Sequence, residues 1–127
     1  MKEIIAVIRM NKMNATKKAL ADAGVSAFHA RPVFGRGKGM VDFSVLEGAK
    51  AGVEEAISQL KPGIKLIPKR LLNVVVPDEK VPAVVQTLIK TNKTGRPGDG
   101  KIFVLPCDDA IRVRTGEHGD NAIDEVV

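Results

Sequence analysis

Two apolar runs, each followed by helical periodicity, constrain the fold of this chain more than any other feature. Residues 3–9 (EIIAVIR) and 71–76 (LLNVVV) predict largely buried strands, because their apolar residues are almost continuous. Residues 27–34 and 102–105 predict two further strands. Residues 111–115 alternate between apolar and other side chains, which predicts a short fifth strand.

The stretches after the two apolar runs have the spacing of amphipathic helices. Asn11 or Asn14 can cap a first helix that ends near Ala23, before Gly24. Asp78 or a neighbour can cap a second helix. The apolar positions of the second helix recur at helical spacing, namely Val81, Val84, Val85, Leu88 and Ile89. A predicted strand therefore precedes and follows each predicted helix.

The order strand-helix-strand, long loop, strand-helix-strand predicts an α+β fold of the ferredoxin-like class, in which the elements run βαββαβ. Right-handed crossovers place both helices on one face of a four-stranded antiparallel sheet. The other face is also rich in Val, Ile and Leu, which favours an oligomer whose subunits cover these faces. Residues 40–68 contain several glycines and prolines and predict a long, partly helical loop.

The size and composition exclude several classes of protein. A chain of 127 residues is enough for one domain. The single cysteine, Cys107, excludes an internal disulfide framework and a four-cysteine metal site. No apolar run approaches the roughly 18 residues of a membrane span, and the first residues lack the pattern of a signal peptide. We therefore expect a cytoplasmic protein.

The net charge of +5 is concentrated in residues 1–39, which hold eight basic and two acidic side chains. This basic third is typical either of a solvated face or of a site for an anion. It also leaves open a small nucleic-acid-binding module. With four Phe, no Trp and no Tyr, however, the chain offers few rings on which bases could stack.

Residues 94–101 (TGRPGDGK) carry the clearest local motif. Gly95, Gly100 and Lys101 match the G-x-x-x-x-G-K pattern of a phosphate-binding loop. Ile102 stands where that loop needs Ser or Thr for magnesium, and the motif lies between a helix and a strand in the reverse order, so a P-loop NTPase is excluded. Glycine backbone and a lysine still suit a phosphate, and an ordinary helix-to-strand turn has the same composition.

Two weaker motifs leave two interpretations each. Residues 35–39 (GRGKG) fit either a hinge into the long loop or a phosphate contact. Arg112 and Arg114 would share one face of a strand, where they could hold a polyphosphate or simply face solvent.

His29 and His118 have no recognisable metal or triad spacing. Because no nucleophile, base and orienting group assemble, we expect no enzymatic activity.

Four segments are similar to motifs of one known family. FGRGKG (residues 34–39) resembles FGRQKG at the start of that family's T-loop, and Pro68-Lys69 resembles the Pro-Lys at its end. TGRPGDGKIFV (residues 94–104) resembles TGKIGDGKIFV of its nucleotide-binding B-loop. IRVRTGE (residues 111–117) resembles its IRIRTGE. On these motifs the chain resembles the PII family of nitrogen-signalling proteins.

The resemblance implies one PII-like domain over residues 1–127, with a T-loop at about 37–69, a B-loop at about 94–101 and a tail at 116–127. It implies a trimer with ATP or ADP in the clefts between subunits, 2-oxoglutarate as the effector, and Mg²⁺ as an accompanying ion. The implied nucleotide-binding residues are Gly35, Arg36, Gly37, Lys38, Val75, Thr94, Gly98, Asp99, Gly100, Lys101, Arg112 and Arg114. The implied effector residues are Gly37, Lys38, Gly39 and Lys69.

The chain departs from the family pattern in three ways. Gly37 stands at the position of the family's glutamine, which helps to hold Mg²⁺ and 2-oxoglutarate. The chain has no tyrosine, so uridylylation of a T-loop tyrosine is excluded. The T-loop is longer than is usual in the family. A long loop without tyrosine resembles the subfamily encoded in nitrogenase gene clusters, whose paired members inhibit dinitrogenase until ATP and 2-oxoglutarate relieve the inhibition.

The resemblance therefore implies a nitrogen- and energy-status sensor whose target is the dinitrogenase component. Regulation of an ammonium channel or of a biosynthetic enzyme is the alternative within the family. A homotrimer and a mixed assembly with a PII-like paralogue both stay open. Neither a nucleic-acid partner nor a membrane span is implied.

Overall fold

The computed structural model describes residues 1–25, 27–37 and 66–123. Four strands form one antiparallel sheet in the order β2-β3-β1-β4. The strands are β1 (Lys2–Arg9), β2 (His29–Gly35), β3 (Ile67–Val76) and β4 (Lys101–Pro106). The helices are α1 (Met13–Asp22), α4 (Val81–Asn92) and α5 (Asp120–Ile123), with 3₁₀ turns η1 (Met10–Lys12) and η2 (Asp78–Lys80). The predicted ferredoxin-like order is confirmed.

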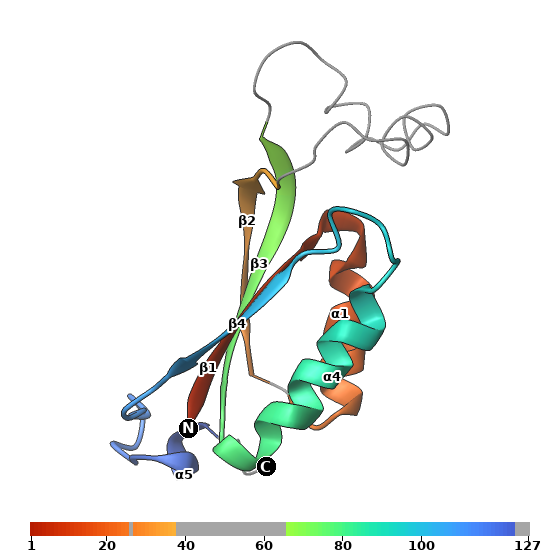
Figure 1. Cartoon of the computed structure of the whole chain (residues 1–127). Helices are drawn as coiled ribbons and strands as arrows, with labels where there is room; N and C mark the ends of the chain where they lie inside the picture. Colours follow the sequence, from red (N-terminus) through yellow and green to blue (C-terminus); the bar gives the residue numbers. More distant parts are fainter. Residues whose placement is uncertain (26, 38–65, 124–127) are drawn as a thin grey trace.

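Helices α1 and α4 lie side by side on one face of the sheet (Figure 1), as right-handed crossovers require. Alternate residues of β1 and β3 are buried beneath them, because successive side chains of a strand point to opposite faces. The buried sheet residues are Ile4, Ala6, Ile8, Leu72, Val74 and Val76, and they pack with Leu20, Val84 and Leu88 of the helices. On the opposite face Phe103 is exposed, as the second apolar face predicts.

Strand β3 begins at Ile67, so the prediction that it starts at residue 71 was wrong. Pro68, Lys69 and Arg70 look unlike a strand in isolation. In the sheet, β3 is paired on both sides, with Arg9 of β1 opposite Lys69 and with β2 on its other edge. Backbone hydrogen bonds to both neighbouring strands outweigh the weak strand propensity of these residues.

The predicted asparagine and aspartate caps were also wrong. Helix α1 follows η1 directly, and its N-cap, Lys12, makes no side-chain capping hydrogen bond. Helix α4 follows η2 in the same way, with Lys80 at its N-cap. The Asp78 carboxylate instead lies 3.0 Å from the amino group of Met1. Each 3₁₀ turn leads the chain into its helix without a side-chain cap.

Residues 111–115 do not form the predicted fifth strand. Ile111 makes a single bridge with His118, and between them the chain reverses through Gly116, whose φ is +74°. The two arginines of this segment therefore lie in a hairpin turn and not on one face of a strand. The tail predicted at 116–127 contains the short helix α5, while 124–127 lie outside the described residues. The predicted long loop falls mainly on 38–65, also outside them.

Candidate functional site

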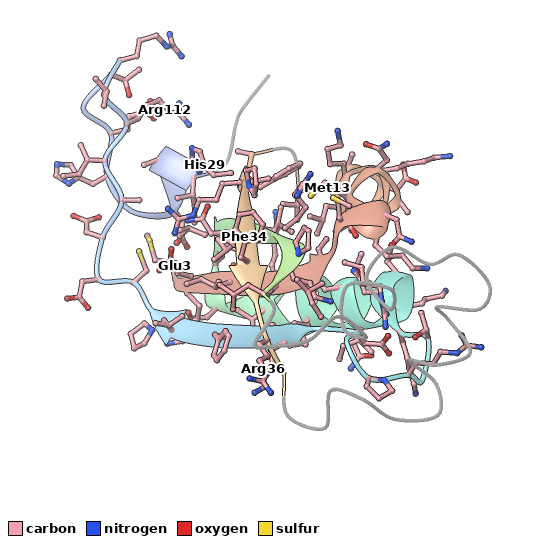
Figure 2. All side chains as sticks on the ribbon, turned by 90° about the horizontal axis from the view of Figure 1, so that it is seen from above. Glu3, Met13, His29, Phe34, Arg36 and Arg112 are labelled. Carbon is pink, nitrogen blue, oxygen red and sulfur yellow. The ribbon has the colours of Figure 1, made fainter. Side chains whose placement is uncertain are left out.

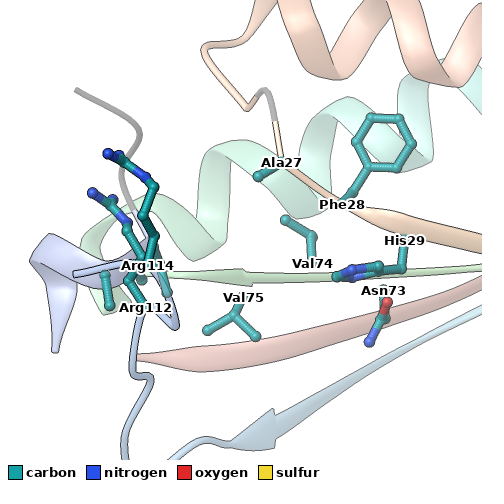
Figure 3. A pocket seen from close by; sticks show the side chains of 10 residues that line it. Ala27, Phe28, His29, Asn73, Val74, Val75, Arg112 and Arg114 are labelled. Carbon is teal, nitrogen blue, oxygen red and sulfur yellow. The ribbon is translucent and has the colours of Figure 1, made fainter. Parts of the chain in front are cut away.

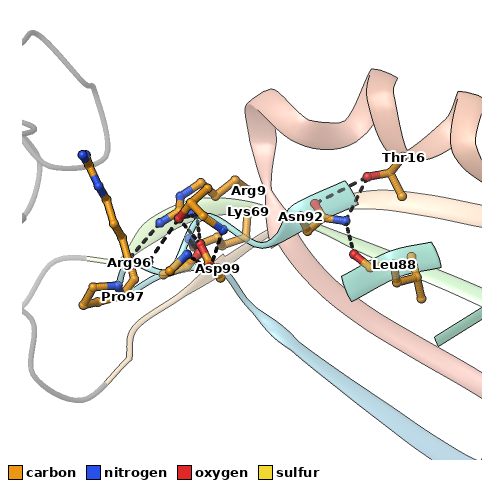
Figure 4. A network of polar contacts seen from close by, with 11 residues as sticks. Arg9, Thr16, Lys69, Leu88, Asn92, Arg96, Pro97 and Asp99 are labelled. Atoms are coloured by element: carbon orange, nitrogen blue, oxygen red, sulfur yellow. Dashed lines mark hydrogen bonds and ion pairs between the residues drawn. The ribbon is translucent and has the colours of Figure 1, made fainter. Parts of the chain in front are cut away.

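Asp99 is the centre of the loop that joins α4 to β4. One carboxylate oxygen, Oδ2, accepts the backbone N–H groups of Thr94 at 2.8 Å and of Gly95 at 3.0 Å. The other, Oδ1, accepts the Thr94 hydroxyl and the Arg9 guanidinium. Burial opposes the charged form, but these hydrogen bonds outweigh it, and they hold the pKa of Asp99 well below its usual range. The carboxylate therefore closes residues 94–99 into a fixed loop (Figure 4).

Arg9, at the end of β1, clamps this loop from the sheet. Its guanidinium pairs with Asp99, and its Nη2 donates to the Pro97 carbonyl at 2.8 Å. Its Nη1 also lies 3.3 Å from the Thr94 hydroxyl oxygen. No motif in the sequence marks Arg9, and the sequence analysis missed it. The only available signal was a cation at the end of a predicted buried strand.

Lys69 supports the loop beside Arg9. The two residues are partners in the antiparallel register of β1 and β3, so both side chains lie on the same face of the sheet. Lys69 is only 8% exposed, and its Nζ donates to the Gly98 carbonyl at 2.9 Å. The predicted effector residue Lys69 and the predicted B-loop are therefore in direct contact.

Two glycines allow the loop to take this path. Gly98 has a φ of +95° and Gly100 a φ of +111°, conformations that side-chain-bearing residues rarely adopt. A Cβ added to Gly100 would lie 1.8 Å from the Val7 carbonyl oxygen, so only glycine fits where the loop joins β4. Lys101 follows as the exposed first residue of β4, opposite Val7.

A second group of predicted residues lines a pocket of about 620 Å³ (Figure 3). Val75, Arg112 and Arg114 meet there, although only the family resemblance had joined Val75 to the two arginines. Phe28, His29 and Asn73 also line the pocket and were missed as ligand residues. Its remaining walls are apolar and come from Ala27, Val74, Ala122 and Ile123. Apolar walls with two guanidinium groups suit a ligand that has an apolar ring and an anionic group.

The two groups lie at opposite ends of the sheet (Figure 1). Along β1, Val7 is opposite Lys101 and Glu3 is opposite Val75. The distance from Glu3 to Val7 is roughly 13 Å at about 3.3 Å per residue. Within one chain, the 94–101 loop and the arginine pocket therefore form two separate half-sites.

The root of the predicted T-loop lies near the first half-site. Gly35 ends β2 opposite Ile67, and Arg36 and Gly37 follow it as exposed residues. Arg36 and Arg112 lie on different parts of the surface (Figure 2). Lys38 and Gly39, the other predicted residues of this root, lie outside the described residues.

The family model for nitrogen regulatory protein P-II matches residues 1–117. The chain belongs to the P-II family. Of its relatives, the nifHD region GlnB-like protein 2 of Methanobacterium ivanovii is 46% identical, over 97% of this chain and 99% of that protein. The protein of the same name from Methanothermococcus thermolithotrophicus is 48% identical, over 97% and 98%. The resemblance inferred from the motifs, including the nitrogen-fixation subfamily, is thus confirmed.

Solved structures agree with this P-II assignment. The crystal structure of Arabidopsis thaliana PII bound to citrate superposes with a TM-score of 0.73 at 29% identity, covering 99% of this chain and 92% of that one. The ferredoxin-like fold is therefore shared with a P-II protein. The family consists of nitrogen regulatory proteins, which makes regulation the role of this chain at the level of the family.

Two searches of the described residues gave negative findings. Among residues 1–25, 27–37 and 66–123, no three His, Cys, Asp or Glu side chains come close enough together to hold a metal ion. In the same part of the chain, no helix is long and apolar enough to cross a membrane.

Proposed function

We propose that this P-II protein is a non-catalytic sensor of nitrogen and energy status that binds ATP or ADP together with 2-oxoglutarate. The observation that carries the proposal is the network in which Arg9, Lys69 and Asp99 fix the 94–100 loop. This network brings the side chains of Arg9 and Lys69 close to a loop whose backbone path depends on glycines, and such a region suits anionic ligands.

The nucleotide phosphates would bind at the loop. Glycine backbone in left-handed conformations can turn N–H groups toward an anion, and Lys101 adds a cation at the start of β4. The residues assigned to this half-site are Thr94, Gly98, Asp99, Gly100 and Lys101, with Gly35, Arg36, Gly37 and Lys38 from the T-loop root. The base would lie against Val75 in the pocket, with Arg112 and Arg114 toward the phosphates.

One chain cannot supply both half-sites to one nucleotide, because they lie at opposite ends of its sheet. A neighbouring copy or a P-II paralogue would bring its arginine pocket to the loop. This is the geometric reason to propose nucleotides between subunits, and the trimer itself is what the family resemblance implies. The exposed apolar side chains on the sheet face without helices, such as Phe103, give such an assembly a surface to bury.

The effector 2-oxoglutarate would bind beside Lys69, next to Gly37, Lys38 and Gly39. Lys69 supplies a cation for a carboxylate there, and Arg9, its partner in the strand register, lies beside it in an ion pair with Asp99. A plant PII has been crystallised bound to citrate, which is also a polycarboxylate. Proteins usually hold Mg²⁺ through one or two carboxylates together with phosphate oxygens, so an accompanying Mg²⁺ would be held mainly by oxygens of the two bound ligands.

Calorimetric titration of ATP, ADP and AMP, each with and without 2-oxoglutarate, tests the proposal. ATP and ADP should bind more tightly than AMP, and ATP should raise the affinity for 2-oxoglutarate. The effect must be reciprocal, because linkage requires 2-oxoglutarate to raise the affinity for ATP by the same factor. Failure of all three nucleotides to bind would refute the proposal.

The proposed partner is the dinitrogenase component, which this protein would inhibit until 2-oxoglutarate binds. The support is that several relatives are named for the nifHD region of nitrogen fixation. Such a partner would place the protein in the cytoplasm, as the sequence analysis expects. Residues 39–68 would contact the partner, so deletion of residues 45–62 should abolish inhibition of dinitrogenase in vitro while nucleotide binding persists. Full inhibition by the deletion variant would contradict this role of the loop.

A further inference from the structure

The segment after Arg114 folds back onto Arg112. Arg112 Nη1 lies 3.1 Å from a carboxylate oxygen of Glu117, and its Nη2 donates to the Asn121 carbonyl at 2.9 Å. Asn121 belongs to α5, whose Ala122 and Ile123 form part of the pocket wall. The tail therefore both orients an arginine of the pocket and builds one side of it.

The hairpin that presents Glu117 is held by its backbone and by Asp109. The backbone N–H of Arg112 donates to the Glu117 carbonyl at 2.9 Å, and the backbone N–H of Gly116 donates to the Arg112 carbonyl at 2.7 Å. Asp109 Oδ1 accepts the Gly119 N–H at 3.1 Å, and Asp109 Oδ2 lies 3.2 Å from His118 Nδ1. None of these contacts uses the Glu117 side chain, so replacing that side chain leaves the frame of the hairpin in place.

We propose that Glu117 is a positioning residue for anion binding, which fixes the guanidinium of Arg112 so that it faces the pocket in one orientation. This rests on the proposed nucleotide-binding function. A guanidinium is planar and has five N–H donors, so contacts with Glu117 and Asn121 fix its plane without exhausting its donors. Arg112 side-chain exposure is 21%, which agrees with a group already held against the protein.

Arg114 provides a comparison within the same pocket. Among the described residues its side chain has no hydrogen-bond or ion-pair partner, and it is exposed. Arg114 must therefore lose its rotamer freedom when a phosphate binds, whereas Arg112 has lost most of it beforehand. Ordering one long side chain in advance improves binding by roughly two- to tenfold. Arg112 should thus contribute more to affinity than Arg114 does, and that excess should depend on Glu117.

The test is a double-mutant cycle on the full chain, read by calorimetry with ATP. Glu117→Ala should weaken ATP binding by about two- to tenfold, and Glu117→Gln by less, because the amide oxygen still accepts a hydrogen bond. In the Arg112→Ala background, Glu117→Ala should have no further effect, since the residue it positions is gone. In the Arg114→Ala background, Glu117→Ala should cause the same loss of ATP affinity as in the unmodified protein. Thermal unfolding of each variant establishes that the chain is folded.

Three outcomes would overturn the inference while nucleotide binding by the unmodified protein stands. The first is unchanged ATP affinity in Glu117→Ala. The second is a loss in the Arg112→Ala background as large as that in the unmodified protein, which indicates a general structural role. The third is an equal loss for adenosine, which has no phosphate. If the unmodified protein binds no nucleotide, the proposed function itself fails first.

Discussion

Lys69 Nζ lies 2.9 Å from the carbonyl oxygen of Gly98, so the start of β3 and the loop before β4 are in direct contact. Lys69 is the residue assigned to the effector, and Gly98 belongs to the loop assigned to the nucleotide. A carboxylate that binds Lys69 must share or displace this contact with the loop. Both proposed ligands therefore act on the same contact between Lys69 and the loop. This shared contact explains how binding of one ligand can change the affinity for the other.

Lys69→Ala should abolish the effect of 2-oxoglutarate on ATP affinity, because it removes a cation and its bond to Gly98. ATP should still bind, with an affinity reduced by at most roughly 10- to 150-fold, since one hydrogen bond to a charged group contributes about 1.5–3 kcal/mol. Calorimetry with and without 2-oxoglutarate measures both effects. Lys90→Ala, which changes an exposed lysine of α4, is the matched control. An unchanged 2-oxoglutarate affinity in Lys69→Ala would remove this residue from the effector site.

Gly100→Ala should destabilise the fold more than Gly95→Ala does. Both positions have positive φ, which costs a residue with a Cβ about 1–2 kcal/mol. At Gly95 the added Cβ meets nothing within 4 Å, whereas at Gly100 it collides with the Val7 carbonyl. Urea unfolding of the two variants measures the difference. Equal losses of stability would show that the close approach at Val7 has no energetic consequence.

Asp99→Asn should make the free energy of unfolding depend less on pH in the acid range. The folded-state pKa of Asp99 lies below its ordinary value of 3.8, so its contribution is complete above that value and is lost as pH falls through the folded pKa. The free energy of unfolding of the unmodified protein should therefore decline between about pH 5 and about pH 2 more steeply than that of Asp99→Asn. Urea unfolding at each pH measures both free energies. If they decline equally with pH in the unmodified protein and in Asp99→Asn, the result would contradict the network around Asp99.

Thr16→Val should cost about 1–3 kcal/mol of stability, because the buried Asn92 amide loses its bond to the Thr16 hydroxyl and keeps only its bond to the Leu88 carbonyl. Asn92 Nδ2 donates to the Thr16 hydroxyl at 3.1 Å, and this bond joins α1 to the end of α4 just before the loop. Thr87→Val, on α4, removes a hydroxyl whose bond to the Ala83 carbonyl is exposed, and it should change stability by less than about 0.5 kcal/mol. Chemical denaturation compares the two variants, and similar effects would argue against a buried polar link between the helices.

The order of strands and helices could be read from the sequence because it depends on local periodicity. The nearly continuous apolar run at residues 3–9 indicates a buried strand, and the helical spacing from Val81 onward indicates which side of the helix is apolar, so a core of this kind follows from the sequence pattern. The glycines of the B-loop were found for a similar reason, since a close turn needs them wherever it occurs. The start of β3 was misplaced because pairing with two neighbouring strands is not a local property.

The sequence by itself determined the fold class, the family and the glycine-rich loop, because each of these depends on residues close together in the chain. Only the tertiary structure decided what holds that loop. Arg9 and Asp99 are far apart in sequence, and they meet because the antiparallel register of β1 with β3 and β4 brings them to one end of the sheet. The structure likewise decided that Glu117 holds Arg112 in a hairpin turn. The alternation of residues 111–115 had predicted a strand there.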